Sequence, residues 1–218
     1  MSLFRDRTDA GRQLGSAVRS RVEISGGAVV LALPRGGVPV GYEVARAIGA
    51  TLDVLLVRKL GVPGREELAM GAIASGGVRI VNHSVTHAYG ISPDTLERVA
   101  AEEQRELERR EGAYRGNRPR PQLAGRTVIL VDDGLATGAS MRAAVAAVRA
   151  GKPARIVVAV PTGAPDTCEV LAAEADEVVC LAMPEPFFAV GASYDLFDQT
   201  SDGEVRELLD RAAETWHN

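Results

Sequence analysis

The sequence predicts an α/β protein with a doubly wound, mostly parallel sheet flanked by helices. Apolar, β-branched runs alternate with helical patterns along most of the 218 residues, which is typical of parallel strands joined by helical crossovers. The chain is long enough for one sizeable α/β domain, and 46% hydrophobic residues is an ordinary value for a globular protein. Since no internal repeat or convincing linker divides the chain, we expect a single domain over residues 1–218.

Five apolar runs predict the main strands, and a shorter run predicts a weaker one. The five are residues 28–34, 52–58, 127–133, 154–161 and 176–184, and the weaker one is 78–82. Helical patterns lie between them at residues 38–50, 140–150 and 164–175, and a short helix is expected at residues 8–22. In the pattern at 140–150, Met141, Ala144, Val145 and Val148 recur at i, i+3, i+4 and i+7, so one face should pack on a sheet.

Two segments depart from this alternation. Residues 93–115 form a charged helical pattern that opens with Ser92 and Pro93, and its Glu and Arg residues at spacings of three and four favour a solvent-facing helix. We therefore expect a charged helical insertion near residues 92–116. Residues 59–77 carry five glycines among small and charged residues, which predicts a long, loose loop of the kind that forms a functional lid or a disordered tip.

Charge and composition exclude several classes of function. The net charge of -4 provides no overall basic field, so a nucleic-acid partner is not expected, although a local basic patch at residues 115–122 stays open. No apolar run approaches the roughly 18 to 20 residues of a membrane span, so we expect no membrane partner and a cytoplasmic location. Cys168 and Cys180 are twelve residues apart without a CxxC pattern, which favours packed thiols over a zinc site.

An acidic pair at the end of a predicted strand raises the question of function. In VILVDDGLATGAS, residues 128–140, Asp132 and Asp133 directly follow a buried run. Two neighbouring carboxylates repel each other and are costly to desolvate, so we expect a positive group beside them. The small residues that follow turn into a helix, where backbone N–H groups and the helix dipole suit a phosphate. The candidate phosphate ligands are Ala136, Thr137, Gly138, Ala139 and Ser140.

The pattern does not match other phosphate or catalytic motifs. A nucleoside triphosphate loop needs a lysine where Ala139 stands, and the chain contains no GxGxxG, GxSxG or HExxH. A phosphate site beside two carboxylates indicates a sugar phosphate whose hydroxyl groups Asp132 and Asp133 accept from, with Mg²⁺ at the same carboxylates easing the charge. A purely structural, helix-capping Asp-Asp turn is the alternative.

Residues 128–140 resemble the thirteen-residue signature of the type I phosphoribosyltransferases, which bind phosphoribosyl pyrophosphate. The resemblance implies the fold of that family over roughly residues 28–184. It also implies that Asp132 and Asp133 contact the ribose 2- and 3-hydroxyls, with Asp133 taking a catalytic part, and that residues 136–140 hold the 5-phosphate. Dimers are common in the family, so a homodimer is possible.

Two further segments resemble parts of the same site. The turn of Arg35, Gly36 and Gly37 resembles the family's pyrophosphate loop. Arg58 and Lys59 end the second predicted strand, where a cation would neutralise the departing pyrophosphate, and Lys59 is the expected catalytic residue. The predicted loop at 59–77 resembles the mobile loop that closes over the substrates and excludes water; its Arg65, Glu66 and Glu67 would close onto the site or stay solvated.

A C-terminal hood and helix are expected near residues 183–218. Residues 187–195 resemble the hood of the hypoxanthine and guanine transferases, which implies that Phe188 stacks on a base and that Asp195 meets its polar edge or a hydrated metal. Core packing of Phe187, Phe188 and Phe197 is the alternative. The purine transferases of that subgroup carry an acid where this chain has Ala136, which leaves the base and its proton acceptor open.

These observations together predict a phosphoribosyltransferase. The expected reaction uses phosphoribosyl pyrophosphate and Mg²⁺ to ribosylate a nitrogen nucleophile, a small purine-like base, with release of pyrophosphate. A regulatory protein that senses phosphoribosyl pyrophosphate without turnover binds the same ligand and is the alternative.

Overall fold

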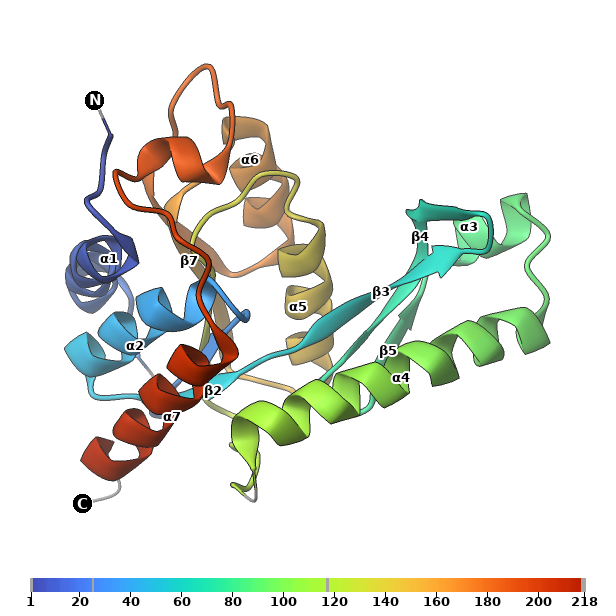
Figure 1. The fold of residues 1–218 in the computed structure, drawn as a ribbon, viewed down its shortest axis with the longest axis horizontal. Coiled ribbons are helices and arrows are strands. Elements are labelled where there is room, and N and C mark those ends of the chain that lie inside the picture. The colour runs from blue at the N-terminus through green and yellow to red at the C-terminus, as the bar shows by residue number, and fades with distance from the viewer. Residues whose placement is uncertain (1, 25, 117, 217–218) are drawn as a thin grey trace.

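A five-stranded parallel sheet forms the centre of the protein in a computed structural model, which describes residues 2–24, 26–116 and 118–216 (Figure 1). The strand order is β2-β1-β6-β7-β8. This confirms the predicted doubly wound, mostly parallel sheet. The strands are β1 (Ala28–Ala32), β2 (Thr51–Val54), β6 (Thr127–Val131), β7 (Arg155–Thr162) and β8 (Glu177–Ala182).

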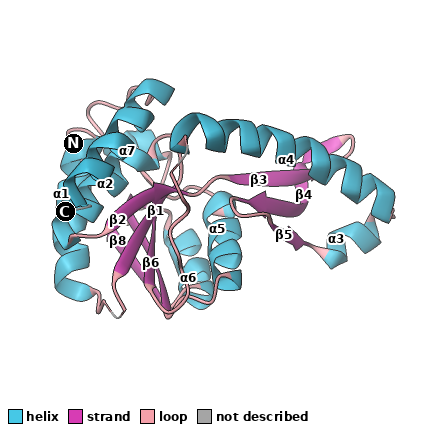
Figure 2. Ribbon diagram, turned by 90° about the horizontal axis from the view of Figure 1, so that it is seen from below, coloured by secondary structure: helices cyan, strands magenta, loops and turns pink. Residues whose placement is uncertain are grey.

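Helices cover both faces of this sheet (Figure 2). Alternate residues of β6 show the division, because Ile129 and Val131 belong to one hydrophobic core while Val128 and Leu130 belong to the other. All four are fully buried, as expected for a central parallel strand. The first core packs against α1 (Arg7–Arg21), α2 (Gly37–Ile48) and α7 (Asp202–Trp216), and the second against α5 (Ala139–Ala150) and α6 (Pro165–Glu174).

The strand order places two loops at the same edge of the sheet. β1 and β6 are parallel neighbours, with Ala32 opposite Val131, and the chain leaves them in opposite directions across the sheet. Ligands of open α/β sheets bind in the crevice at such a reversal, beyond the carboxyl ends of the strands. We therefore expect a ligand-binding site at the loops after Ala32 and Val131.

The predicted loose loop at residues 59–77 is wrong. Those residues lie in a three-stranded antiparallel sheet with order β3-β4-β5, made of β3 (Val57–Val62), β4 (Arg65–Ala74) and β5 (Val78–Val81). Two of the glycines are required by the strands and their turns. Gly64 has φ +74 in the tight turn between β3 and β4. A Cβ on Gly71 would lie 2.4 Å from the Ile80 carbonyl oxygen of the neighbouring strand. The strand predicted at 52–58 is accordingly divided between β2 and β3.

This small sheet extends from the core as an arm together with α3 (His83–Ala88) and α4 (Pro93–Arg115) (Figure 1). The predicted helix at 93–115 is confirmed, and Ser92 caps it. The expectation that it faces solvent holds for its charged side only, because Ala100, Leu107 and Tyr114 recur every seven residues and are buried. This stripe joins α4 to the same core as α1 and α2.

Ion pairs fix the C-terminal end of α4 to the core. The Arg115 guanidinium lies 2.8 Å from an Asp53 carboxylate oxygen of β2, and it also pairs with Glu111. Arg118 and Arg120, from the basic patch at residues 115–122, pair with Asp210 and Glu111. The patch is therefore largely neutralised within the chain.

The segment between β8 and α7 is irregular apart from a short 3-10 helix, η1 (Val190–Ser193). We call residues 183–201 the hood. The two terminal residues of the predicted hood-and-helix region, 217 and 218, lie outside the described residues. Among the residues that the structure describes, no helix combines the length and apolar character needed to cross a membrane.

The burial of Leu107 predicts that α4 contributes to global stability. Leu107→Ala should lower the free energy of unfolding by about 2–5 kcal/mol, because it leaves a cavity in the core, whereas Leu196→Ala, at a side chain that is 58% exposed, should change it by less than about 0.5 kcal/mol. Urea unfolding of the two variants measures the difference. Equal, small effects would contradict the packing of α4 on the core.

Candidate functional site

The loop after β6 leads directly into the N-terminus of α5. Gly138, with φ +69, precedes the first helical residue, Ala139, and has no side chain to cap the helix. The first N–H groups of a helix have no intrahelical partner, and Thr137 and Ser140 are exposed beside them. The loop is held from α6, because the Thr167 hydroxyl donates to the Ala136 carbonyl at 2.7 Å.

The turn of Arg35, Gly36 and Gly37 packs directly on the acidic pair. A Cβ on Gly36 would lie 2.0 Å from an Asp133 carboxylate oxygen, and one on Gly37 would lie 2.9 Å from the Asp132 Cα. Any larger residue would force the two loops apart. The structure thus brings together two segments that are far apart in the sequence, with the Arg35 side chain at the open edge.

The positive group expected beside the acidic pair is Arg7. Its Nε donates to Asp133 Oδ2 at 2.8 Å, and its Nη1 donates to the Asp198 carbonyl at 2.6 Å. The guanidinium carbon lies 3.9 Å from the centroid of the Phe197 ring. No local pattern around Arg7 indicates this role, because its partner lies 126 residues further along the chain.

No cation among the residues that the structure describes forms a comparable ion pair with Asp132. Burial raises its pKa well above the ordinary value, and the charge of Asp133 raises it further. Burial also raises the pKa of Asp133, although Arg7 opposes that shift. The Asp133 backbone N–H donates to Asp132 Oδ1 at 2.8 Å. The other carboxylate oxygen of Asp132 can still accept a hydrogen bond. A positive charge nearby would offset the cost of ionising this buried carboxyl.

This donor set suits a hard divalent cation. Carboxylate oxygens are ligands that Mg²⁺ prefers, and Mg²⁺ commonly binds through one or two carboxylates together with substrate oxygens and water. No cluster of three His, Cys, Asp or Glu side chains that could hold a metal ion occurs in the described part of the chain. Asp132 and Asp133 could therefore hold the ion only with ligands from a substrate and from water.

A cavity of about 180 Å³ opens beside Asp132. Three arginines line it, one each from the turn after β1, from β3 and from α4, and each also pairs with a carboxylate: Arg35 with Asp202, Arg58 with Glu103 and Arg110 with Glu106. Guanidinium groups recognise phosphate oxygens well. Sequence reasoning missed the contribution of α4. The charged and polar residues of the lining are Arg35, Arg58, Arg110, Tyr114, Asp132 and Ser140.

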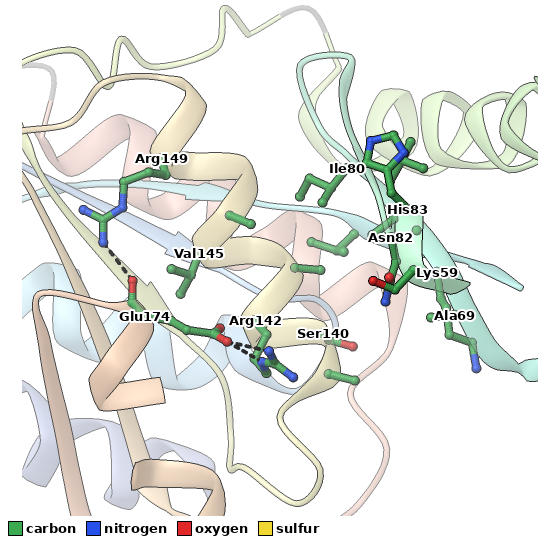
Figure 3. Close-up of a pocket in the computed structure, with 18 residues that line it drawn as sticks. Lys59, Ala69, Ile80, Asn82, His83, Ser140, Arg142, Val145, Arg149 and Glu174 are labelled. Carbon is green, nitrogen blue, oxygen red and sulfur yellow. Dashed lines mark hydrogen bonds and ion pairs between the residues drawn. The ribbon is translucent and has the colours of Figure 1, made fainter. Parts of the chain in front are cut away.

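Lys59 lines a different, larger space. A groove of about 850 Å³ separates α5 from the small sheet, and Lys59 and Asn82 line it from the arm opposite Ser140 and Arg142 (Figure 3). The Lys59 amino group donates to the Glu67 carbonyl at 3.2 Å. The groove adjoins the cavity, since Val57 and Ser140 line both. Of the two candidate cations, Arg58 lines the cavity with Asp132 and Lys59 does not.

The hood is docked on the acidic pair. The Tyr194 hydroxyl donates to the Asp133 carbonyl at 2.6 Å, and the hydroxyls of Ser193 and Thr162 are 2.9 Å apart. A Cβ on Gly134 would lie 2.5 Å from the Val190 side chain. Hood residues therefore contact the first part of the loop after β6 and the end of β7.

The structure separates the aromatic residues of the hood by environment. Phe188 is 83% exposed, so core packing is wrong for this residue and its ring is free to meet a ligand. Phe197 instead stacks on Tyr194 with ring centroids 5.0 Å apart and covers Arg7. Asp195 is exposed and accepts a hydrogen bond from the Ser2 hydroxyl.

The raised pKa of Asp132 predicts that its charge destabilises the fold. At pH values below the usual aspartate pKa of about 3.9, the carboxyl is protonated in both states and costs nothing. As the pH rises through the folded-state pKa, Asp132 must ionise where it is desolvated, and stability falls. Asp132→Asn should therefore raise the free energy of unfolding at pH 7 by about 0.5–2 kcal/mol, and the gain should shrink as the pH is lowered.

Asp133→Asn is the matched control for this prediction. It leaves the part-buried Arg7 guanidinium without its carboxylate, so it should lower the free energy of unfolding by about 1–3 kcal/mol at pH 7. Urea unfolding at several pH values measures both variants. Destabilisation by Asp132→Asn at pH 7 would show that the Asp132 charge is already compensated.

Comparisons with known proteins agree with this geometry. The chain is 50% identical to the Mycobacterium tuberculosis protein "Putative phosphoribosyl transferase Rv0571c" over 213 residues, which is 97% of this chain and 47% of that protein. It thus spans about half the length of that relative. A solved structure, TT1426 from Thermus thermophilus, is 46% identical, with a TM-score of 0.85 over 94% of this chain and 97% of that one.

A more distant solved structure supports the fold alone. AQ2163 from Aquifex aeolicus is 11% identical, with a TM-score of 0.50 over 93% of this chain and 84% of that one. The family model of the phosphoribosyl transferase domain matches residues 20–196, a range that contains both site loops and most of the hood. The chain therefore belongs to the phosphoribosyltransferase family.

Proposed function

We propose that this protein transfers a phosphoribosyl group from phosphoribosyl pyrophosphate to a nitrogen nucleophile, a purine-like base, and releases pyrophosphate. One observation carries the proposal: the turn of Arg35, Gly36 and Gly37 is in contact with Asp132 and Asp133, and the open start of α5 follows directly. The site thus offers two places for anionic groups with paired acceptors between them. A donor with a phosphate at one end of a ribose and a pyrophosphate at the other fits that order.

Each part of the donor has a proposed place. The 5-phosphate would bind the N–H groups of residues 136–140, with the hydroxyls of Thr137 and Ser140 as further donors. The ribose hydroxyls would donate to Asp132 and Asp133. Asp132 would be the stronger acceptor, because Arg7 already occupies one oxygen of Asp133.

The leaving pyrophosphate would lie at the turn of Arg35, Gly36 and Gly37. Arg58 lines the same cavity while its Nε pairs with Glu103, and its remaining N–H donors would stabilise the charge that develops as the bond to the ribose breaks. Lys59 remains a proposed catalytic residue, since it lies in the adjoining groove two residues from Val57. Lys59 would take part in catalysis if a movement of the arm brought its amino group towards the cavity.

Mg²⁺ is the proposed cofactor. When bound, the ion would neutralise charge on the pyrophosphate and so ease its departure. Asp132 and Asp133 would hold it, in keeping with the raised pKa of both carboxyls. Arg7 limits how far Asp133 can turn towards the ion.

The acceptor base would bind under the hood. Phe188 offers an exposed ring for stacking, and Asp195 offers a carboxylate for the polar edge of a base. Ala136 supplies no acid near the base, so its proton would have to leave to another group or to water. A protein that binds the donor without turnover is the competing proposal, and a turnover assay separates the two.

The test of the proposed reaction is pyrophosphate release. Purified protein with phosphoribosyl pyrophosphate and Mg²⁺ should release pyrophosphate when a purine base is added, in a screen of adenine, hypoxanthine, guanine, xanthine, uracil and orotate. Donor binding by calorimetry is measured in parallel. Binding without release for any base would favour the sensor, and absence of binding would reject both functions.

The acidic pair should be essential for donor binding. Asp132→Asn combined with Asp133→Asn replaces both ribose-accepting carboxylates, which would also hold Mg²⁺, with weaker neutral acceptors. The affinity for phosphoribosyl pyrophosphate with Mg²⁺ should therefore fall at least about 100-fold, as expected when two charged partners are lost. The control is Glu177→Gln, which changes a carboxylate that pairs with Arg155 at the amino ends of β7 and β8. This variant should bind phosphoribosyl pyrophosphate as the unmodified protein does. Unchanged affinity in a folded double variant would refute the site.

A further inference from the structure

We infer that Arg110 of α4 binds the pyrophosphate end of the donor, which makes this charged helix part of the active site. The inference rests on the proposed function and adds a specificity residue to it. Arg110 comes from a segment whose sequence pattern predicted only a solvent-facing surface. In the structure it lines the cavity beside Asp132, together with Arg35 of the pyrophosphate turn.

The packing of α4 fixes the direction in which Arg110 points. Tyr114 lies one turn further along the helix and lines the same cavity, and both Tyr114 and Leu107 are buried against the core. The helix therefore cannot rotate about its axis without exposing that stripe. The buried residues on either side of Arg110 therefore fix its backbone position next to the cavity.

Tyr114 contributes an uncharged side chain to the cavity lining next to Arg110. Its hydroxyl donates to Asp202 Oδ1 at 2.6 Å. Burial and this hydrogen bond raise the pKa of Tyr114 to about 12, so the phenol stays protonated and adds no negative charge near a bound anion.

The arginines at the cavity keep donors free for a ligand. Arg110 Nε contacts Glu106 Oε1 at 2.7 Å, and the Arg110 side chain is still 49% exposed. A guanidinium has five N–H donors, so the remaining ones can reach phosphate oxygens in the bidentate geometry that arginine favours. Arg35 Nη1 lies 3.8 Å from Asp202 Oδ1, a long ion pair that also leaves guanidinium donors available.

The position of Arg110 favours the pyrophosphate over the 5-phosphate. Arg110 shares its cavity with Arg35 of the pyrophosphate turn, whereas Ser140 alone among the proposed 5-phosphate ligands at residues 136–140 lines that cavity. A pyrophosphate carries more negative charge than a phosphate monoester. Three arginines line this one small cavity, and the free N–H donors of their guanidinium groups suit the oxygens of such an anion.

Arg109 provides a matched comparison on the same helix. It also binds Glu106, with contacts of 2.8 and 2.9 Å. It lines a neighbouring cavity with Arg35, Arg110 and Asp202, but, unlike Arg110, it is not part of the lining beside Asp132. Replacing Arg109 changes the charge of α4 by the same amount as replacing Arg110 and keeps the Asp132 cavity intact.

Calorimetry with two separate probes tests the inference. Arg110→Met should weaken the binding of pyrophosphate with Mg²⁺ by about 10- to 100-fold, as expected for the loss of a charge-assisted hydrogen bond. The same variant should bind ribose 5-phosphate within about twofold of the unmodified protein. Arg109→Met should bind both probes normally, and Arg110→Lys should recover part of the pyrophosphate affinity.

Three outcomes overturn the inference while the proposed function stands. They are unchanged pyrophosphate affinity in Arg110→Met, equal weakening of both probes, and an equal loss in Arg109→Met. In each case the unmodified protein still binds phosphoribosyl pyrophosphate. If the unmodified protein binds neither phosphoribosyl pyrophosphate nor pyrophosphate, the proposed function itself fails. Thermal unfolding of each variant confirms that it is folded before binding is measured.

Discussion

Two adjacent carboxylates at the buried end of β6 impose the main constraint on this structure. Their mutual repulsion and desolvation are offset on one side only, where Arg7 donates to Asp133. That single ion pair links α1 to the loop after β6, and Phe197 and Tyr194 of the hood close over it. The other carboxylate, Asp132, lines a cavity that three arginines share. The ion pair thus fixes the position of one carboxylate, and in the proposed function both carboxylates meet the ribose of the donor.

The arrangement of the sheet turns this local constraint into a site. Because β1 and β6 are neighbours at the reversal of strand order, their loops meet at the same level, and Gly36 and Gly37 allow contact that any side chain would prevent. The arm adds the third wall through Arg58 and Arg110. Three parts of the chain that are distant in sequence thus surround one small volume, which is how open α/β folds build ligand sites.

Sequence patterns predicted the parts of the site that depend on neighbours along the chain. The acidic pair, the proposed phosphate loop and the sheet follow from local composition and periodicity. The contact of Arg7 with Asp133 and the place of Arg110 in the cavity lining could not be found in this way, because only the folded chain brings these residues together. The loop predicted at 59–77 failed for a related reason: a glycine that permits close strands, such as Gly71, looks the same in sequence as one that permits a flexible loop. The buried stripe through Leu107 was not recognised in the sequence, because most residues between its members are charged.

The central claim is that a ribosyl donor binds where the acidic pair meets the phosphate loop. A crystal structure of the protein with phosphoribosyl pyrophosphate and Mg²⁺ tests it most directly. We expect density for the 5-phosphate at residues 136–140, for the ribose beside Asp132, and for the pyrophosphate near Arg35, with the contact between Arg7 and Asp133 retained. Donor density elsewhere on the protein, with this loop empty at saturating concentration, would contradict the account.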